Sequence, residues 1–122
     1  MPDTAEQYKL GVEAFKAGNT DTAIEALEEV TRLDHQNHRA FSYLGAAYAA
    51  KGRFNAAIGA FKQAEQIAPR VASIHFNIAQ AYEASGIPNE AEYEYERALE
   101  IDPNYTRARE ALDVLKKKLG HV

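Results

Sequence analysis

Histidine is the only residue type in this sequence that titrates near neutral pH, so its four copies are the first candidates for chemistry. His35 and His38 lie three residues apart and could together chelate a metal ion. However, Asp34 is the only carboxylate beside them, and the chain has no cysteine. Bound zinc needs three or four protein ligands. We therefore interpret both as histidines of a surface turn, and we expect neither a metal site nor a cofactor.

Carboxylates are the second candidates, because four glutamates alternate along one stretch: Glu90, Glu92, Glu94 and Glu96. On a helix, alternate spacing spreads side chains over different faces, so this row does not form an acid/base pair. A calcium loop would need turns and dense oxygen ligands. The row is therefore interpreted as a solvated helix face.

Motifs of known enzyme chemistry are missing from the sequence. It has no HExxH, no glycine-rich phosphate loop and no serine nucleophile motif, and without cysteine it has no thiol catalysis. We therefore expect that the protein is not an enzyme.

Charge and hydropathy exclude further classes. Eighteen acidic residues against fourteen basic ones give a net charge of −4, which disfavours nucleic acid as a partner. No stretch approaches the roughly 18 apolar residues of a membrane span, and residues 1–9 lack the pattern of a secretory signal. We expect a cytoplasmic protein with neither a nucleic-acid nor a membrane partner.

The elements that must position these residues repeat every 34 residues. Glycine recurs at Gly18, Gly52 and Gly86, and alanine recurs at Ala23, Ala57 and Ala91, without an insertion or deletion. Helix-forming residues dominate nearly every window. The period therefore predicts three helical-hairpin units over residues 4–37, 38–71 and 72–105, followed by a tail over 106–122.

The middle unit carries the residues of a known signature: Phe41, Leu44, Gly45, Tyr48, Ala57, Phe61 and Pro69. This pattern resembles the tetratricopeptide repeat (TPR), with Phe41 in place of the usual tryptophan. The resemblance covers essentially the whole chain. It implies an all-α, right-handed α-solenoid, a single domain over 1–122 in which three helix-turn-helix TPR units precede a capping helix.

Local signals predict the helix ends and the packing. The recurring glycines should end the first helix of each unit, while Ala68-Pro69 and Asp102-Pro103 should end the second helices. We expect small Gly11, Gly45 and Ala79 to face the recurring small alanines where paired helices approach closely. Six aromatic residues are assigned to the core: Phe41, Tyr48, Phe54, Phe61, Tyr82 and Tyr95.

Two polar residues occupy positions that are apolar in the other units. His75 stands where unit two has Phe41, so we expect it to pack and to form a hydrogen bond. Glu92 stands where the other units have isoleucine. Either the outer helix is less buried there, or Arg97 or a lysine pairs with the carboxylate.

The tail begins like a fourth repeat and then departs from the pattern. Leu112 keeps the apolar position, whereas Asp113 replaces the small residue and three lysines follow at 116–118. Terminal repeats need a polar outer face. We expect a capping helix, with the lysines solvated near its carboxyl end.

The TPR resemblance also implies a function, since such arrays bind peptides and proteins in a concave groove lined by the first helices. Aromatic side chains would anchor an apolar ligand, and polar ones would bond its extended backbone. Arg107, Glu110 and Val114 of the capping helix would line the far end. The predicted peptide-binding residues are Tyr8, Val12, Tyr43, Ala46, Ser73, Phe76, Asn77 and Gln80.

One TPR subclass holds the acidic tails of heat-shock chaperones with a clamp of Lys, Asn, Asn, Lys and Arg. The matching positions here are Tyr8, Val12, Tyr43, Ser73 and Asn77. Without cationic donors a terminal carboxylate has no charge-assisted partner. We therefore expect no binding of this kind.

Charge alternates along the repeats, with net values of −4, +4 and −6 for the three units and +3 for the tail. Alternating signs suit attraction between neighbouring units, but they could also join two copies of the chain. The alternative function is therefore self-assembly into a homo-oligomer, through the groove or the charged ends.

Overall fold

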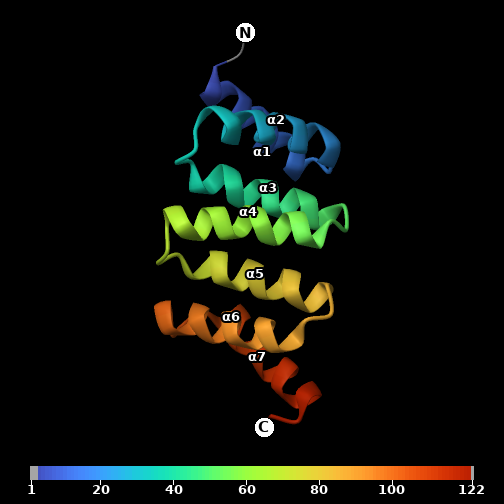
Figure 1. Ribbon diagram of the computed structural model, residues 1–122, viewed down its shortest axis with the longest axis vertical. Coiled ribbons are helices and arrows are strands. Elements are labelled where there is room, and N and C mark those ends of the chain that lie inside the picture. Colours follow the sequence, from blue (N-terminus) through green and yellow to red (C-terminus); the bar gives the residue numbers. More distant parts are fainter. Residues whose placement is uncertain (1–2, 122) are drawn as a thin grey trace. The chain divides into compact units, whose positions relative to one another are not determined.

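The computed structural model describes residues 3–121, and every regular element within them is an α-helix (Figure 1). The helices are α1 (Thr4–Lys16), α2 (Thr20–Leu33), α3 (His38–Ala50), α4 (Phe54–Ile67), α5 (Ala72–Ala84), α6 (Pro88–Ile101) and α7 (Thr106–Leu119). The prediction of an all-α helical-repeat fold is confirmed. None of these described helices has the length and apolar character that crossing a membrane would need.

The chain divides into two compact units, which are described separately. The first ends at Ala68 and contains α1 to α4. The second begins at Pro69 and contains α5 to α7.

Glycine ends the first helix of each hairpin, as the sequence predicts. Gly18, Gly52 and Gly86 have φ angles of 84°, 76° and 80°, in the left-handed region that a residue with a Cβ rarely adopts. The third hairpin continues with Pro88 at the start of α6, where its missing N–H costs nothing. The predicted ends before Pro69 and Pro103 are also confirmed, since α4 stops at Ile67 and α6 at Ile101.

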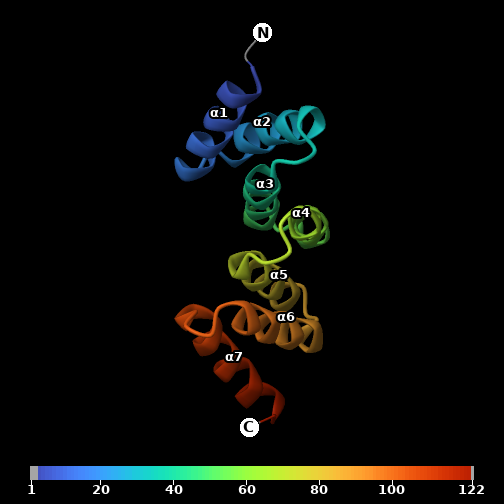
Figure 2. The same ribbon diagram turned by 90° about the vertical axis from the view of Figure 1, so that its left-hand side faces the viewer.

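The first unit is built from two antiparallel helix pairs, α1 with α2 and α3 with α4, joined through the contact of α2 with α3. Figure 2 looks along α3 and α4, which lie side by side. Leu27, Val30, Ala40 and Ala47 are completely buried and form the centre of its core.

The helix pairs approach closely at Gly11 and Gly45, but the residues that face these glycines are large. A Cβ added to Gly45 would lie 2.6 Å from Cε1 of Phe61, and one added to Gly11 would lie 2.7 Å from Cγ of Leu27. The expectation that small alanines face the glycines is therefore wrong. The recurring alanines, such as Ala57, are buried one helical turn away, and each glycine leaves room for a bulky side chain.

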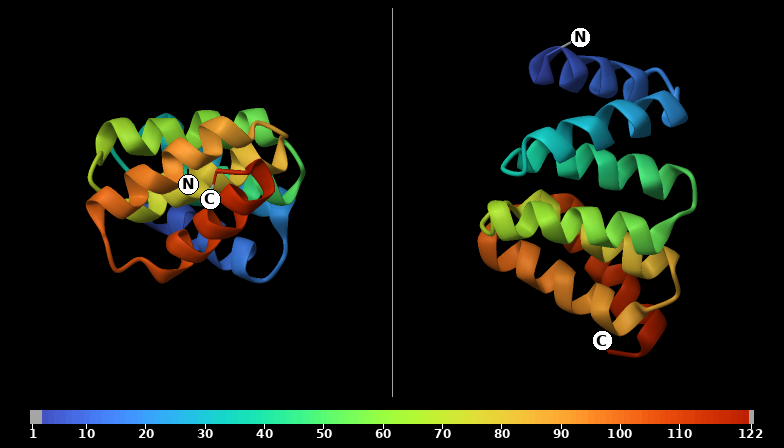
Figure 3. Two further views of the ribbon diagram at one scale, coloured as in Figure 1. Left: turned by 90° about the horizontal axis from the view of Figure 1, so that it is seen from below. Right: turned by 45° about the horizontal axis from the view of Figure 1, so that its top comes forward.

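The second unit packs α5 against α6, and α7 against α6 (Figure 3, α7 in red and α6 in orange). The apolar face of α7 buries Ala108, Leu112 and Leu115 in the same cluster as Phe76 and Tyr95. Gly120 ends α7 with a φ of 76°. The tail therefore forms the expected helix, with Leu112 at the expected buried position.

The aromatic residues assigned to the core divide into two groups. Phe61 and Tyr95 are buried, as predicted. The other four are half-buried: Phe41, Tyr48, Phe54 and Tyr82. Tyr48 shows why, because its ring packs on the first unit's core while its hydroxyl group donates a hydrogen bond to the Glu28 carboxylate at the surface.

Candidate functional site

In the first unit, the predicted anchor Tyr43 is the centre of an aromatic cluster formed by Tyr8 and Phe15 of α1 and Tyr43 of α3. The Tyr43 ring meets the edge or face of both others, at centroid distances of 6.2 Å to Tyr8 and 5.9 Å to Phe15. All three rings are half-buried against the core. The cluster is therefore fixed from below and accessible from outside, as an interface anchor requires.

The phenol of Tyr8 stays protonated at neutral pH. Burial raises its pKa above the ordinary value, and the neighbouring Tyr43 adds to this, while the positive charge of Arg39 acts in the opposite direction. The aromatic cluster thus presents an uncharged hydroxyl group that can donate or accept a hydrogen bond. Val12 of α1 and Ala46 of α3 are the other predicted contact residues of this unit, and both are half-buried.

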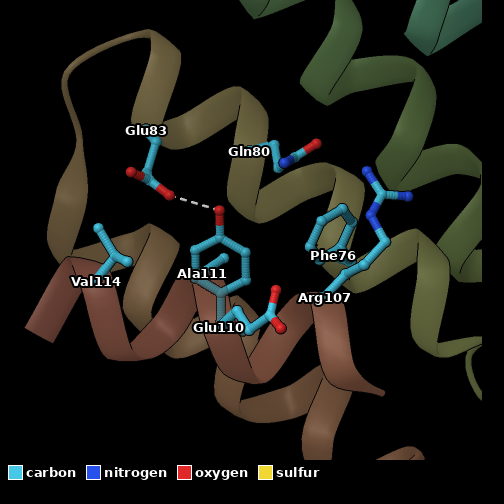
Figure 4. A pocket seen from close by; sticks show the side chains of 8 residues that line it. Phe76, Gln80, Glu83, Arg107, Glu110, Ala111 and Val114 are labelled. Atoms are coloured by element: carbon cyan, nitrogen blue, oxygen red, sulfur yellow. Dashed lines mark hydrogen bonds between the residues drawn. The ribbon is translucent and has the colours of Figure 1, made fainter.

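In the second unit, α5, α6 and α7 enclose an open hollow of about 350 Å³ (Figure 4). We call it the α5–α7 hollow. Its lining combines aromatic, apolar and charged side chains: Phe76, Gln80, Glu83, Tyr95, Arg107, Glu110, Ala111 and Val114. The structure thus brings the predicted residues Phe76 and Gln80 together with three capping-helix residues that were expected near the groove.

Phe76 lies deeper than its prediction as a protruding anchor implies. Its side chain is only 2% exposed. The ring stacks on Tyr105 at a centroid distance of 5.3 Å, and the Arg107 guanidinium lies 4.8 Å from the ring centroid. Both covering residues belong to the tail, beyond the repeats from which the prediction was made. Phe76 therefore forms the floor of the hollow.

Glu83 is held in place at the rim of the hollow. The Tyr95 hydroxyl group donates a hydrogen bond to Oε1 of Glu83, with an oxygen–oxygen distance of 2.5 Å (Figure 4). Burial raises the pKa of Tyr95, and the hydrogen bond to the carboxylate raises it further. A neutral phenol therefore orients a carboxylate acceptor at neutral pH.

The remaining predicted residues of the second unit lie on α5 but do not line this hollow. Ser73 is exposed and Asn77 is half-buried. Their contact with a ligand stays a prediction.

The two polar residues at apolar repeat positions both have partners. His75 is 1% exposed, and its Nδ1 lies 2.8 Å from Oε1 of Glu94, so the expected packing and hydrogen bonding are confirmed. Glu92 pairs with His121, whose Nδ1 lies 2.8 Å from Oε1 of the carboxylate. The expected partner Arg97 instead forms an ion pair with Glu100 on its own helix.

Sequence reasoning did not assign Tyr95 to the site, because burial and site lining were treated as alternatives. Tyr95 satisfies both conditions: it is 1% exposed, yet it contributes to the wall of the α5–α7 hollow. A tyrosine at a position held by Leu27 and Phe61 in the other units was the available signal, because a buried hydroxyl group needs a polar partner nearby.

Known proteins similar to this chain share its repeats. A small glutamine-rich tetratricopeptide repeat-containing protein 2 from Mycosarcoma maydis is 31% identical over 117 residues, which are 95% of this chain and 33% of that protein. The chain thus spans about a third of this relative's length.

Two solved structures show the same fold. The crystal structure of MamA has a TM-score of 0.94 and 25% identity, and the match covers 98% of this chain and 70% of MamA. The Yersinia enterocolitica type III secretion chaperone SycD, in complex with a peptide of the translocator YopD, has a TM-score of 0.89 and 26% identity, with 97% and 96% covered.

The family models agree with these matches. One model described as tetratricopeptide repeat matches residues 8–72, and a second matches residues 72–105. Together with the helical hairpins and their glycine turns, these matches show that the chain belongs to the tetratricopeptide repeat family.

Proposed function

We propose that this chain is a non-enzymatic scaffold that binds a peptide or protein segment through apolar and aromatic contacts. The observation that carries the proposal is the aromatic cluster, in which Tyr43 is fixed by two rings and still half exposed to a ligand. The proposed contact residues are Tyr8, Val12, Tyr43 and Ala46 in the first unit, and Ser73, Phe76, Asn77 and Gln80 in the second.

The structural relative SycD supports this proposal, since its structure holds a peptide of another protein. A cytoplasmic location, and partners that are neither nucleic acids nor membranes, are part of the same proposal. Alternating repeat charges keep self-assembly as a second candidate. Light scattering over a range of protein concentrations separates the two, because a homo-oligomer grows in mass as concentration rises.

The test uses peptides selected from a random phage-displayed library on the immobilised chain. We expect calorimetry to show saturable binding, and Tyr43→Ala to weaken it by about 1–3 kcal/mol, as for a central aromatic anchor. Since the Tyr43 ring also packs on Tyr8 and Phe15, the variant will lose some stability as well.

Tyr48→Ala is the matched control. Tyr48 has the same residue type, lies on the same helix and is also half-buried, but its hydroxyl group contacts α2 instead of the α1 rings. It should retain peptide affinity once binding is referred to the folded fraction. Equal losses of affinity in both variants would contradict the assignment of Tyr43, and a library that yields no binding peptide would contradict the proposed function.

The missing clamp gives a second test. Peptides that carry the acidic carboxyl-terminal tail of heat-shock chaperones should show no saturable binding at physiological salt, even at roughly 100 μM. The reason is that Tyr8, Val12 and Tyr43, with Ser73 and Asn77, offer no cation to a terminal carboxylate. A low-micromolar complex by calorimetry would show that cations elsewhere on the chain replace the clamp.

A further inference from the structure

The charges of the α5–α7 hollow are arranged so that a negative region remains unoccupied. Its lining includes two carboxylates, Glu83 from α5 and Glu110 from α7, and one cation, Arg107. In Figure 4, Glu83 and Val114 lie at one end, Phe76 and Arg107 lie at the other, and Glu110 lies between them. The hollow is therefore divided into a positive end and a larger negative part.

The positive end is already used by the protein itself. The Arg107 guanidinium lies 4.8 Å from the centroid of the Phe76 ring, within the range of a cation–π contact. Within residues 3–121, Arg107 forms no ion pair with either carboxylate of the hollow. Its charge therefore leaves Glu83 and Glu110 without neutralisation by contact.

The negative part has acceptor capacity left over. Glu83 accepts one hydrogen bond, from the Tyr95 hydroxyl group, although a carboxylate offers about four acceptor positions. Among the described side chains, none donates a hydrogen bond to the Glu110 carboxylate. The surrounding repeat, residues 72–105, has a net charge of −6, so the wider field also favours a cation.

We propose, on the basis of the proposed function, that the α5–α7 hollow binds an arginine side chain of the peptide ligand. A planar guanidinium carries five N–H donors and can reach acceptors on two opposite walls, whereas an ammonium group is a strongly hydrated point charge. Ala111 and Val114 line the same hollow and would cover the methylene stem. A volume of about 350 Å³ lies at the small end of ligand pockets and suits one side chain.

The experiment follows the backbone amide signals of the isotope-labelled chain by NMR while an acetylated and amidated Ala-Arg-Ala peptide is added. We expect saturable shifts at Gln80, Glu83, Glu110 and Ala111, with a dissociation constant of about 1 mM. A peptide with citrulline in place of arginine keeps the shape and loses the charge. It should bind about fivefold more weakly, as expected for partly exposed ion pairs.

Matched variants locate the effect. Glu110→Gln should lower arginine-peptide affinity to that of the citrulline peptide, and Glu83→Gln should do the same while it still accepts the Tyr95 hydrogen bond. Glu90→Gln makes the same charge change at an exposed position of α6 and should alter nothing. Raised salt should weaken the arginine peptide alone.

Equal affinity for the arginine and citrulline peptides, or no shifts in the hollow, would overturn the proposal. A matching glutamate peptide that binds more tightly would do so too, and would assign the hollow to Arg107. If library-selected peptides bind through Tyr43 while the arginine peptide fails, only this inference is lost. If the arginine peptide binds in the hollow but no library peptide binds, the proposed function is the part that fails.

Discussion

At the scale of the residue, two tyrosine–glutamate hydrogen bonds link neighbouring helices. Tyr48 of α3 donates to Glu28 of α2, and Tyr95 of α6 donates to Glu83 of α5. Burial raises the pKa of Tyr48 to about 12, and the hydrogen bond to the carboxylate contributes to the same shift. Burial and the same kind of hydrogen bond raise the pKa of Tyr95 as well. Each pair needs a protonated phenol.

These pairs predict an alkaline limit to stability. A phenol in the unfolded chain has a pKa of about 10, below its value in the folded protein. The stabilisation is therefore fully present below pH 10, and it is lost as pH rises through the folded pKa. We expect the free energy of unfolding, measured in urea, to be flat from about pH 7 to pH 9 and to fall above pH 10.

Single phenylalanine variants assign that fall. Tyr95→Phe and Tyr48→Phe remove one titrating hydroxyl group each and should make the decline above pH 10 shallower. Tyr93→Phe is the control, because Tyr93 is 60% exposed. A decline that is equally steep in all three variants would show that other groups set the alkaline limit.

The same scale shows where prediction from sequence succeeds and where it ends. His75 could be placed in the core because the repeat assigns it the position of Phe41, and its burial and contact with Glu94 follow. The partner of Glu92 could not be found in this way. His121 lies beyond the repeats, so no equivalent position predicts that it contacts α6.

At the scale of the element, each hairpin of the first unit is fixed by a glycine on one helix and a large side chain on the other. Gly45 of α3 faces the Phe61 ring of α4, and Gly11 of α1 faces Leu27 of α2. The helix bounds could be predicted from the 34-residue period and the glycine turns. The facing residue could not, since Ala57 and Phe61 lie one turn apart on the same helix face and the period does not determine the axial offset between two helices.

Two glycine-to-alanine substitutions test this packing. Gly45→Ala should lower the free energy of unfolding by about 1–3 kcal/mol, because its Cβ would lie 2.6 Å from the Phe61 ring. Gly59→Ala is the matched control on α4, where an added Cβ meets nothing within 4 Å. It should raise stability by up to about 1 kcal/mol through helix propensity alone. Chemical denaturation measures both, and a neutral Gly45→Ala would contradict the close approach.

At the scale of the whole molecule, stability is spread over neighbouring helices, as expected for repeat arrays. In the second unit, α7 supplies Ala108, Leu112 and Leu115 to the core that also holds Phe76 and Tyr95. This helix therefore covers apolar surface of the last repeat. It also provides one wall of the α5–α7 hollow, so that fold and candidate site depend on the same element.

Removal of residues 106–122 should lower both the melting temperature and the solubility, because the apolar surface under α7 becomes exposed. Leu112→Ala is the milder variant and should cost about 2–5 kcal/mol, since the side chain is 5% exposed. Arg109→Ala on the exposed face should change stability by no more than about 0.5 kcal/mol. An unchanged melt after the deletion, measured by circular dichroism, would contradict the capping role of α7.

The pairing of a glycine with one particular large residue limits how the hairpins can be recombined. Phe61 occupies the space above Gly45, whereas the smaller Leu27 occupies the equivalent space above Gly11. A chimera that exchanges complete hairpins keeps each matched pair and conserves the packing inside it. One that exchanges only α2 for α4 would place a phenyl ring where a leucine side chain now fits. The unit of modular exchange, in engineering or by duplication, is therefore the hairpin and not the single helix.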